Sequence, residues 1–460
     1  MRTALAYGAE QIEVELPDTT VTPDTGIAVP LPRADDLGAA YRRALTDPLD
    51  TPPLREVATG ASSVTIAFDD PTVGQYGPVW STALPIILSE LEAAGVKRTS
   101  VRLICANALH RKFTHDELAR LLGNDLVREF GDRLYCHDAE DADNLVQLGT
   151  TANGYHVELN KAVVDDDLTV YLNCSTVRGF SGGWKSICVG LSTFRSIRAH
   201  HNPDDMSMSF DRNRMHQMLD EMGALVTREL GPNRIFKVET IQANPFVVSE
   251  VLGGSVDATR ARAVEIMRAH QSNRRDLVAE KVDVVVYGIP DWSPYGAFSS
   301  MNPILTLIST GLGYMGGVIE AFGKPGCTVI LATPCRNEWN RRHHVSYPEV
   351  WERVLPVTRD PYEARASFED DFATRDEYID AYRNHNAFHG VHGIMAIFPL
   401  KRLKHAGRVF VAGATDPSLP RHVGFESFAT VEDAAAEAKQ IHGPDATFAA
   451  VGYPPATSRQ

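Results

Sequence analysis

The chain has 460 residues, of which 43% are hydrophobic and 23% charged, and its formal net charge is −14 at pH 7. This length exceeds what one hydrophobic core usually serves, so two domains are expected. The negative charge argues against nucleic acid and anionic membranes as partners, because both require a basic surface.

The cysteines and the N-terminal segment bear on the cellular compartment. The six cysteines are scattered, and none forms a Cys-x-x-Cys pair. Reduced thiols in a cytosolic protein are the simplest interpretation. Residues 1–18 carry three glutamates and no long apolar run, so neither a signal peptide nor a membrane span is expected there. We therefore expect a cytoplasmic protein without a membrane partner.

Short β-branched segments alternate with helical patterns in the first half of the chain. The second helical pattern opens on a Thr-x-x-Glu capping box and closes on a glycine. A rhythm of this kind indicates a mostly parallel sheet with helices on both faces. Strands are predicted at 62–70, 100–110 and 168–175, and helices at 80–97 and 114–123.

The same rhythm restarts after a charged helical stretch at 257–281. We predict an α/β protein of two domains, each with a mostly parallel sheet flanked by helices. Residues 1–275 would form an N-terminal cofactor-binding domain, and 276–460 a C-terminal domain whose last segment could pack back on the first. The later strands are predicted at 281–291, 326–335, 407–416 and 446–455.

Unusual polar residues follow the predicted strands. Asp70 and Asp291 each come directly after a strand, as does His110, and the segment 175–185 follows a third. In open α/β sheets, ligands bind at the carboxyl ends of the strands. These segments are therefore expected to converge, and with two such domains the active site would lie in an interdomain cleft.

The segment "VYLNCSTVRGFSGGWKSICVG" (170–190) is close to a phosphate-binding loop. Trp184 stands where such a loop needs a second glycine, so the match to an ATP or GTP loop is poor. The glycines still allow close approach of the backbone to a ligand. Lys185 could be a surface lysine, but its apolar flank favours a partly buried amine with a shifted pKa, able to act as a nucleophile.

The histidines offer further candidate groups. His110 has the position of a general base, or of a side chain that bonds a backbone carbonyl. His200 and His201 could lie in a solvated loop, or one of them could bind Ni, Zn or Cu together with other ligands. Three histidines within 385–392 have metal-compatible spacing, although Gly390 interrupts the pattern.

Three segments together resemble the lactate racemase family, whose enzymes use a nickel-pincer nucleotide: "ANALHRKFTHDEL", "GFSGGWKSICVGL" and "STFRSIRAHHN". The resemblance implies that Lys185 anchors this pyridinium-3,5-bisthiocarboxylic acid mononucleotide through a thioamide. His201, or His200 in the alternative register, would complete the planar coordination of Ni(II). The neighbouring residues implied to bind the cofactor are Gly179, Ser181, Gly182 and Gly183.

The family's chemistry is hydride transfer between substrate carbon and cofactor, with acid/base groups on both faces of the substrate. The resemblance gives His110 one of these roles, and it places Asp70 and Ser175 in the catalytic group. Ser175 stands where the family has its second histidine, so that role could instead fall to Tyr295 or to the histidines of 385–392. Substrate contacts are assigned to Thr72, Ser299, Asn302 and Tyr295.

The residues that differ from the family's pattern argue that lactate is not the substrate. Val73 replaces the family's arginine, and Ser299 and Asn302 align with its glutamine and lysine. Recognition of a carboxylate favours arginine-like donors. We expect a racemase or epimerase that inverts a hydroxyl-bearing carbon of another 2-hydroxy acid or of a sugar-like compound. Its partners would be this small substrate and cofactor biosynthesis and insertion proteins, with the oligomeric state open. The alternative is a non-catalytic binder or carrier of the cofactor or a related nucleotide.

Overall fold

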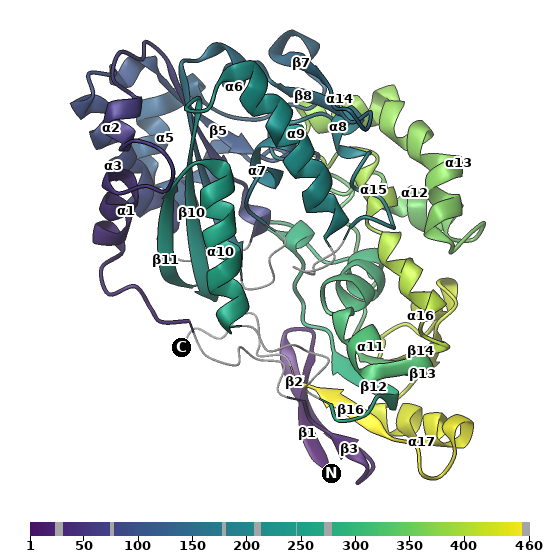
Figure 1. The fold of residues 1–460 in the computed structure, drawn as a ribbon. Helices are drawn as coiled ribbons and strands as arrows, with labels where there is room; N and C mark the ends of the chain where they lie inside the picture. Colours follow the sequence, from purple (N-terminus) through teal and green to yellow (C-terminus); the bar gives the residue numbers. More distant parts are fainter. Residues whose placement is uncertain are drawn as a thin grey trace. The chain divides into compact units, whose positions relative to one another are not determined.

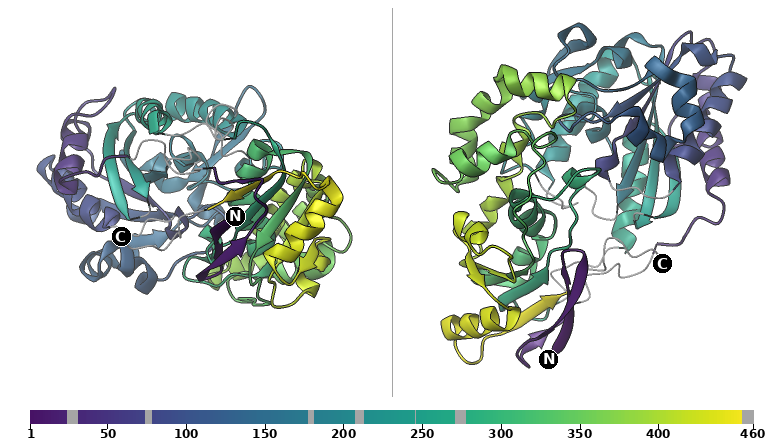
Figure 2. Two further views of the ribbon diagram at one scale, coloured as in Figure 1. Left: turned by 90° about the horizontal axis from the view of Figure 1, so that it is seen from below. Right: turned by 180° about the vertical axis from the view of Figure 1, so that it is seen from behind.

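The computed structural model describes residues 1–23, 31–73, 78–176, 181–206, 213–244, 246–270 and 278–452. The chain divides into two compact units, coloured along the sequence in Figures 1 and 2. Both units are α/β with helix-flanked, mainly parallel sheets, as predicted. The boundary at residue 275 and the interdomain cleft stay predictions. Unit 1 comprises Met1–Ala28, Ser272–Tyr378 and Gly390–Gln460, and unit 2 comprises Val29–Gln271 and Ile379–His389.

Unit 2 contains a six-stranded sheet in the order β11-β10-β9-β4-β5-β6. Its neighbouring strands are parallel except for the β10–β11 pair. The three strands predicted in this part of the chain are confirmed as β4, β5 and β9. The strands are β4 (Val64–Asp69), β5 (Val101–Ala106), β6 (Leu134–Cys136), β9 (Leu168–Thr176), β10 (Ile235–Asn244) and β11 (Val247–Gly254).

Helices cover both faces of this sheet (Figure 1). Helices α1 and α3 contribute to the large hydrophobic core on one face, whereas α7 and α10 contact β9 and β10 on the other. The predicted capping box is present, with Thr114 and Glu117 bonding reciprocally at the start of α4. The helices are α1 (Leu37–Thr46), α2 (Leu54–Val57), α3 (Val79–Ala93), α4 (His115–Leu122), α5 (Asn124–Phe130), α6 (Lys161–Asp165), α7 (Lys185–Cys188), α8 (Phe194–Ile197), α9 (Arg214–Leu230) and α10 (Val256–His270), and a hairpin is formed by β7 (Leu145–Thr150) and β8 (His156–Asn160).

Unit 1 contains a second six-stranded sheet, in the order β15-β14-β13-β12-β16-β3, with all neighbours parallel. The four later strands predicted from sequence are confirmed as β12, β13, β14 and β16. The N-terminal segment adds the edge strand β3 and an antiparallel hairpin. The strands are β1 (Arg2–Tyr7), β2 (Glu10–Glu15), β3 (Thr20–Val21), β12 (Val282–Gly288), β13 (Gly323–Ala332), β14 (Arg408–Ala412), β15 (Glu426–Phe428) and β16 (Phe448–Val451).

The helical segments of unit 1 include two of π type. The first, η7 (Ile304–Tyr314), follows the loop after β12, and the second is η8 (Val350–Val354). The α-helices are α11 (Gly317–Phe322), α12 (Tyr347–Glu349), α13 (Pro361–Thr374), α15 (His392–Met395), α16 (Ser418–His422) and α17 (Val431–His442), and α14 (Asp376–Asn384) begins in unit 1 and ends in unit 2.

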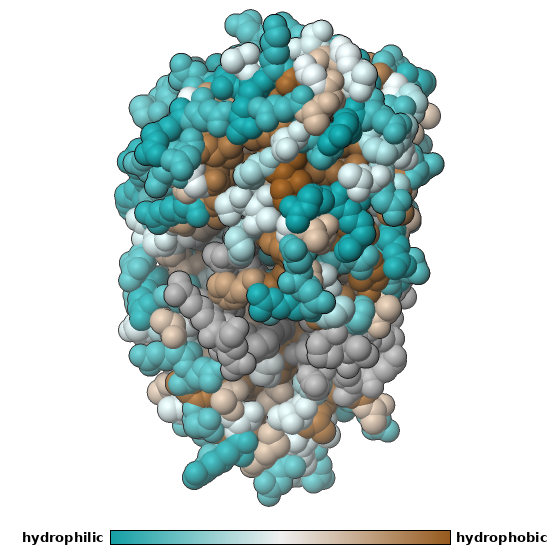
Figure 3. Space-filling model, turned by 90° about the vertical axis from the view of Figure 1, so that its left-hand side faces the viewer, coloured by the Kyte–Doolittle hydropathy of each residue, from teal (hydrophilic) through white to brown (hydrophobic). Residues whose placement is uncertain are grey.

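One apolar helical stretch among the described residues, Ile304–Phe322, is long enough to cross a membrane by length and composition. Of this stretch, 78% is buried inside the structure, as in the core helix of a globular protein. Figure 3 shows hydrophilic and apolar residues interspersed over the face that it displays. The large apolar side chains exposed in the described ranges are scattered along the sequence: Met1, Val21, Phe298, Val357 and Ile441.

Candidate functional site

The two faces of the unit 2 sheet differ in chemistry. Because side chains alternate along a strand, residues such as Phe68, Leu172 and Val238 share the face that forms the hydrophobic core. The intervening residues carry buried polar groups under α7, which we call the polar layer. Polar groups buried in this way require partners within the protein. The polar layer consists of Asp69, Tyr171, Asn173, Ser175, Lys237 and Glu239.

Asp70 and His110 form a hydrogen-bonded pair at the carboxyl ends of β4 and β5. Asp70 Oδ2 lies 2.9 Å from His110 Nδ1. The Thr72 hydroxyl donates to Asp70 Oδ1 at 2.5 Å and also lies 3.1 Å from His110 Nδ1. The His110 side chain is 25% exposed, whereas that of Asp70 is 3% exposed. An Nδ1–H bonded to a buried carboxylate leaves Nε2 as the basic nitrogen of the imidazole, which suits a general base.

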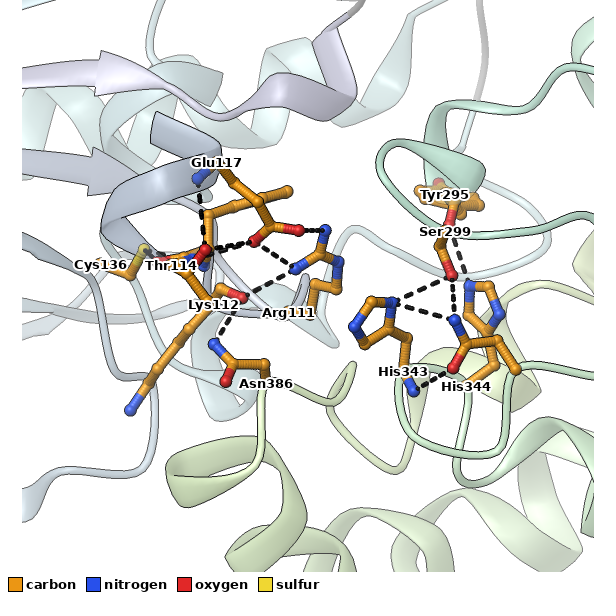
Figure 4. A network of polar contacts seen from close by, with 12 residues as sticks. Arg111, Lys112, Thr114, Glu117, Cys136, Tyr295, Ser299, His343, His344 and Asn386 are labelled. Atoms are coloured by element: carbon orange, nitrogen blue, oxygen red, sulfur yellow. Dashed lines mark hydrogen bonds and ion pairs between the residues drawn. The ribbon is translucent and has the colours of Figure 1, made fainter. Parts of the chain in front are cut away.

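The segment after His110 is fixed by its own contacts. Arg111 is fully buried, donates to Glu117 at 2.8 Å, and stacks over the Phe113 ring at 4.3 Å. The Asn386 amide donates to the Lys112 carbonyl at 3.0 Å, which is drawn with the Arg111–Glu117 pair in Figure 4. These contacts hold the turn between β5 and α4, and therefore the backbone of His110.

Asp69 is satisfied within the polar layer. It accepts hydrogen bonds from the Tyr171 hydroxyl and from the Cys174 backbone N–H, both at 3.0 Å. Burial raises the pKa of Asp69 to about 6, and the charge of Lys237 opposes that rise. Burial also raises the pKa of the Cys174 thiol well above its usual value. Cys174 is therefore a structural residue and not a ready thiolate.

The glycine loop before Lys185 packs directly on the polar layer. Gly182 has φ +90°, and a Cβ there would lie 2.4 Å from Glu239 Oε1 and 2.7 Å from Ser175 Oγ. Only glycine fits this position without displacing its neighbours. Arg260 fastens the loop by donating to the Ser181 carbonyl at 2.7 Å, and its side chain covers Gly183. The predicted cofactor residue Gly179 lies outside the described residues.

Trp184 has a structural role that explains the missing phosphate-loop glycine. It is buried, its indole N–H donates to Asp257 Oδ1 at 2.8 Å, and its ring packs against Gly223 of α9. Lys185 follows it as the first residue of α7 and is partly buried. Burial lowers the pKa of the Lys185 amine to about 8, although Asp69 and Asp70 oppose the shift.

The two adjacent histidines lie ring to ring, with Nδ1 of His200 2.8 Å from Nδ1 of His201. His200 is fully buried and His201 partly buried. Burial lowers the pKa of His200 to about 3, and the nearby charge of Lys185 lowers it further. In the described ranges, His200 Nε2 has no hydrogen-bond partner. Lys185 is therefore close enough to His200 for the charge of the amine to lower the pKa of the imidazole.

The predicted substrate residues of unit 1 lie in the loop after β12 (Figure 4). The Ser299 hydroxyl is 3.0 Å from Asn340 Nδ2 and 3.1 Å from His343 Nδ1. Asn340 Nδ2 is also 3.2 Å from His343 Nδ1. Asn302 is fully buried, and its Oδ1 accepts the Leu305 backbone N–H at the start of η7. The structure therefore uses Asn302 to cap a helix.

Tyr295 lies in a cluster of aromatic and imidazole rings. Its hydroxyl accepts a hydrogen bond from Tyr314 at 3.1 Å, and its carbonyl is 2.9 Å from His344 Nε2. The His392 ring stands perpendicular to the Tyr295 ring, with centroids 4.4 Å apart. The Tyr347 hydroxyl is 2.9 Å from His392 Nδ1.

The three histidines of 385–392 have different partners. His385 pairs with Asp380 at 3.2 Å, and His389 pairs with Glu140 at 3.0 Å, whereas His392 contacts Tyr347. Within the part of the chain that the structure describes, no three His, Cys, Asp or Glu side chains are grouped to hold a metal ion.

Comparisons with known proteins find similarity to lactate racemases. The lactate racemase N-terminal domain model matches residues 7–211. A lactate racemase of Thermoanaerobacterium thermosaccharolyticum is 28% identical over 347 residues, covering 72% of this chain and 74% of the relative. A lactate racemase of Lactiplantibacillus plantarum is 28% identical over 183 residues, covering 38% of this chain and 42% of the relative. These matches support membership of the lactate racemase family.

Solved structures show the same fold. The lactate racemase apoprotein of Thermoanaerobacterium thermosaccharolyticum superposes with a TM-score of 0.69 at 19% identity, covering 98% of both chains. A Thermotoga maritima protein superposes with a TM-score of 0.54 at 14% identity, covering 92% of this chain and 98% of its own. Membership of the lactate racemase family supports racemase activity on a small molecule, and it implies a nickel-pincer nucleotide as the family's cofactor.

Three observations in unit 2 fit that cofactor. The Lys185 amine has a lowered pKa, which favours the neutral, nucleophilic form. His200 offers a buried ring nitrogen without a hydrogen-bond partner in the described ranges. Gly182 and Gly183 let the loop backbone lie directly against Glu239, Ser175 and Arg260, which brings the Lys185 loop close to the polar layer. His201, the predicted nickel ligand, bonds His200 through Nδ1, so the choice between the two histidines stays open.

Sequence reasoning missed several residues of this lactate racemase-like site. Lys237 and Glu239 lie on β10, which was not predicted as a strand, and Arg260 lies on α10. The signal was present in "RIFKVETIQ" (234–242), where two charged residues alternate with apolar ones. Charged residues spaced by two in an apolar run indicate a buried strand with one polar face.

Proposed function

We propose that this protein is a racemase or epimerase that inverts a hydroxyl-bearing carbon of a 2-hydroxy acid or sugar-like compound other than lactate. One observation carries the proposal: the Lys185 amine lies close enough to Asp70 for that carboxylate to raise the pKa of the amine, and close enough to His200 for its own charge to lower the pKa of that imidazole. Lys185, the Asp70–His110 pair and the His200–His201 pair therefore lie near one another in unit 2. A nickel-pincer nucleotide held there would supply the hydride acceptor.

In this proposal, unit 2 holds the cofactor through named side chains. Lys185 is the covalent anchor, because its amine is partly neutral near pH 8. The backbone of Gly182 and Gly183 packs closely on the polar layer, and glycines in this loop would also let the cofactor approach the backbone. His201 or His200 supplies an imidazole nitrogen to the nickel, for which imidazole is a suitable ligand.

His110 is the proposed general base, and Asp70 positions it. The carboxylate accepts Nδ1–H of the imidazole, which leaves Nε2 as the basic nitrogen that takes the proton of a substrate hydroxyl. Thr72, assigned to substrate from sequence, donates to Asp70 instead. We therefore propose that Thr72 orients the Asp70 carboxylate and acts on the substrate only through this carboxylate.

A substrate other than lactate is supported by the loss of cationic carboxylate ligands. Val73 stands where the family has arginine. In unit 1, Ser299, Asn340 and His343 form a neutral network, and both hydrogen-bond donors directed at His343 Nδ1 favour the tautomer with a proton on Nε2. Neutral donors and acceptors of this kind suit hydroxyl groups better than a carboxylate.

The test is co-expression with cofactor biosynthesis and insertion proteins in the cytoplasm, followed by intact mass, peptide mapping of Lys185 and nickel analysis. Chiral chromatography then follows lactate, malate, glycerate, gluconate and glucose as substrates. We expect modified Lys185, about one nickel per chain, and turnover of a compound other than lactate. Unmodified Lys185 without nickel refutes the proposal, as does lactate as the best substrate. Loading without any turnover supports the non-catalytic binder or carrier instead.

A further inference from the structure

Ser175 occupies the place of the family's second catalytic histidine, and its surroundings are unusual for a lone serine. Its hydroxyl donates to Glu239 Oε1 at 2.6 Å. It also accepts a hydrogen bond from Asn173 Nδ2 at 3.1 Å. A serine is a weak base by itself, but one that is bonded to a carboxylate can pass a proton on.

Glu239 is built into the sheet beside Ser175. The parallel pairing of β9 and β10 sets Glu239 opposite Asn173, on the polar face of the sheet. Glu239 is fully buried, and its second oxygen, Oε2, has no hydrogen-bond partner in the described ranges. The positive charges of Lys237 and Arg260 act on this carboxylate and offset the cost of burying it.

The pair also contacts the loop that leads to Lys185. A Cβ at Gly182 would overlap both Glu239 Oε1 and Ser175 Oγ, so the loop backbone rests on the two side chains. A buried carboxylate with one oxygen left without a hydrogen bond costs stability, and the retention of so costly a group indicates a functional role for the carboxylate. The Glu239 carboxylate lies under the loop that leads to Lys185, the proposed anchor, and this position favours a role in proton transfer.

We propose that Ser175 and Glu239 act together as the second acid/base of the reaction, in place of the family's histidine. This inference rests on the proposed function. For one enantiomer, the substrate hydroxyl gives its proton to Ser175 Oγ while the serine's own proton passes to Glu239 Oε1. The hydride at the same carbon would be taken up by the cofactor and returned to the other face of the planar carbonyl. Ser175 keeps a hydroxyl, Glu239 becomes a neutral acid, and the protonated His110 returns a proton to the product oxygen on the other face. For the opposite enantiomer the two groups exchange roles.

A structural role for the pair makes a different prediction from a relay. In Glu239→Gln, the amide oxygen can still accept the Ser175 hydrogen bond and fill the same space, but the side chain cannot take up a proton. A structural role therefore predicts activity close to wild type. A relay predicts that kcat falls by about a hundredfold or more, in the range of lost general-base catalysis, with little change in KM.

The experiment uses cofactor-loaded protein and the two enantiomers of the panel compound with the highest turnover. The variants are Glu239→Gln, Ser175→Ala and His110→Asn, with Glu250→Gln on the neighbouring strand β11 as the matched control. Nickel content, the mass of the Lys185 peptide and thermal unfolding establish that each variant is folded and loaded. After one turnover, acid quench and phenylhydrazine detect the oxidised 2-oxo form of the substrate.

We expect Glu239→Gln to form the 2-oxo compound from one enantiomer only, and His110→Asn from the other only. Infrared difference spectra of the wild type should show a carboxylic-acid carbonyl band on adding the first enantiomer, and the band should be absent in Glu239→Gln. Loaded Glu239→Gln that forms the 2-oxo compound from both enantiomers at wild-type rates, or that keeps the band, overturns the inference. If the loaded wild type turns over no panel compound, the proposed function fails instead.

Discussion

The protonation of Lys185 can be measured without cofactor or substrate. Burial lowers the pKa of this amine to about 8 from the usual lysine value of 10.5. At pH 8 about half of the amine would then be neutral, against roughly 0.3% for an unperturbed lysine. The neutral amine is the nucleophile, so reactivity at pH 8 should exceed that of an unperturbed amine roughly 150-fold for equal access.

The perturbation that tests the cause is Asp70→Asn. The negative charge of Asp70 raises the Lys185 pKa against the larger effect of burial, so its removal should move the midpoint below 8. The assay is competitive labelling of the apoprotein with acetic anhydride from pH 6 to 11, with peptide mapping of Lys185. The exposed Lys97 serves as the internal standard for reagent concentration. A wild-type midpoint near 10.5, or an upward shift in Asp70→Asn, would refute the reasoning.

Three further predictions concern activity and stability. In cofactor-loaded protein, Asp70→Asn should lower kcat by roughly 10²-fold or more, because the carboxylate that fixes the Nδ1–H tautomer of His110 is lost. Chiral chromatography measures the loss, and the nickel content should be unchanged. Gly182→Ala should lower the free energy of unfolding by about 1–3 kcal/mol in thermal melts, and more than Gly60→Ala, which has a similar φ but open space around it. Because burial lowers the pKa of Lys237 to about 8, the unfolded chain binds more protons between about pH 8 and 10.5. The unfolding free energy should therefore rise with pH in that window, and urea titrations of Lys237→Met should show a smaller rise.

The fold was largely predictable because its signals are local. The strands β4, β5 and β9 are rich in apolar residues and lead into polar residues at their carboxyl ends, and α4 carries a complete capping box. The edge strand β3 was beyond such reasoning. Two residues leave almost no periodic signal, and their pairing with β16 joins parts of the chain more than 400 residues apart.

The candidate site was predictable only where spacing along the chain carries information. His110, Lys185 and the histidine pair could be proposed as site residues from their order along the chain and from the resemblance that this order carries. Ser175 looked like a lost catalytic residue because its partner Glu239 lies 64 positions away on another strand. Asn302 looked like a substrate ligand because the sequence does not show that its side chain caps η7.

The polar layer explains how such a site can change its acid/base residue without losing its fold. Two lysines and Arg260 act on three buried carboxylates in unit 2, and each group is held by strands or helices rather than by a free loop. A histidine replaced by serine leaves the charge balance of that layer untouched, because serine is neutral. The neighbouring carboxylate on β10 is already desolvated and already bonded to residue 175. In the proposed relay, the second proton acceptor is therefore a carboxylate that the sheet already holds beside residue 175.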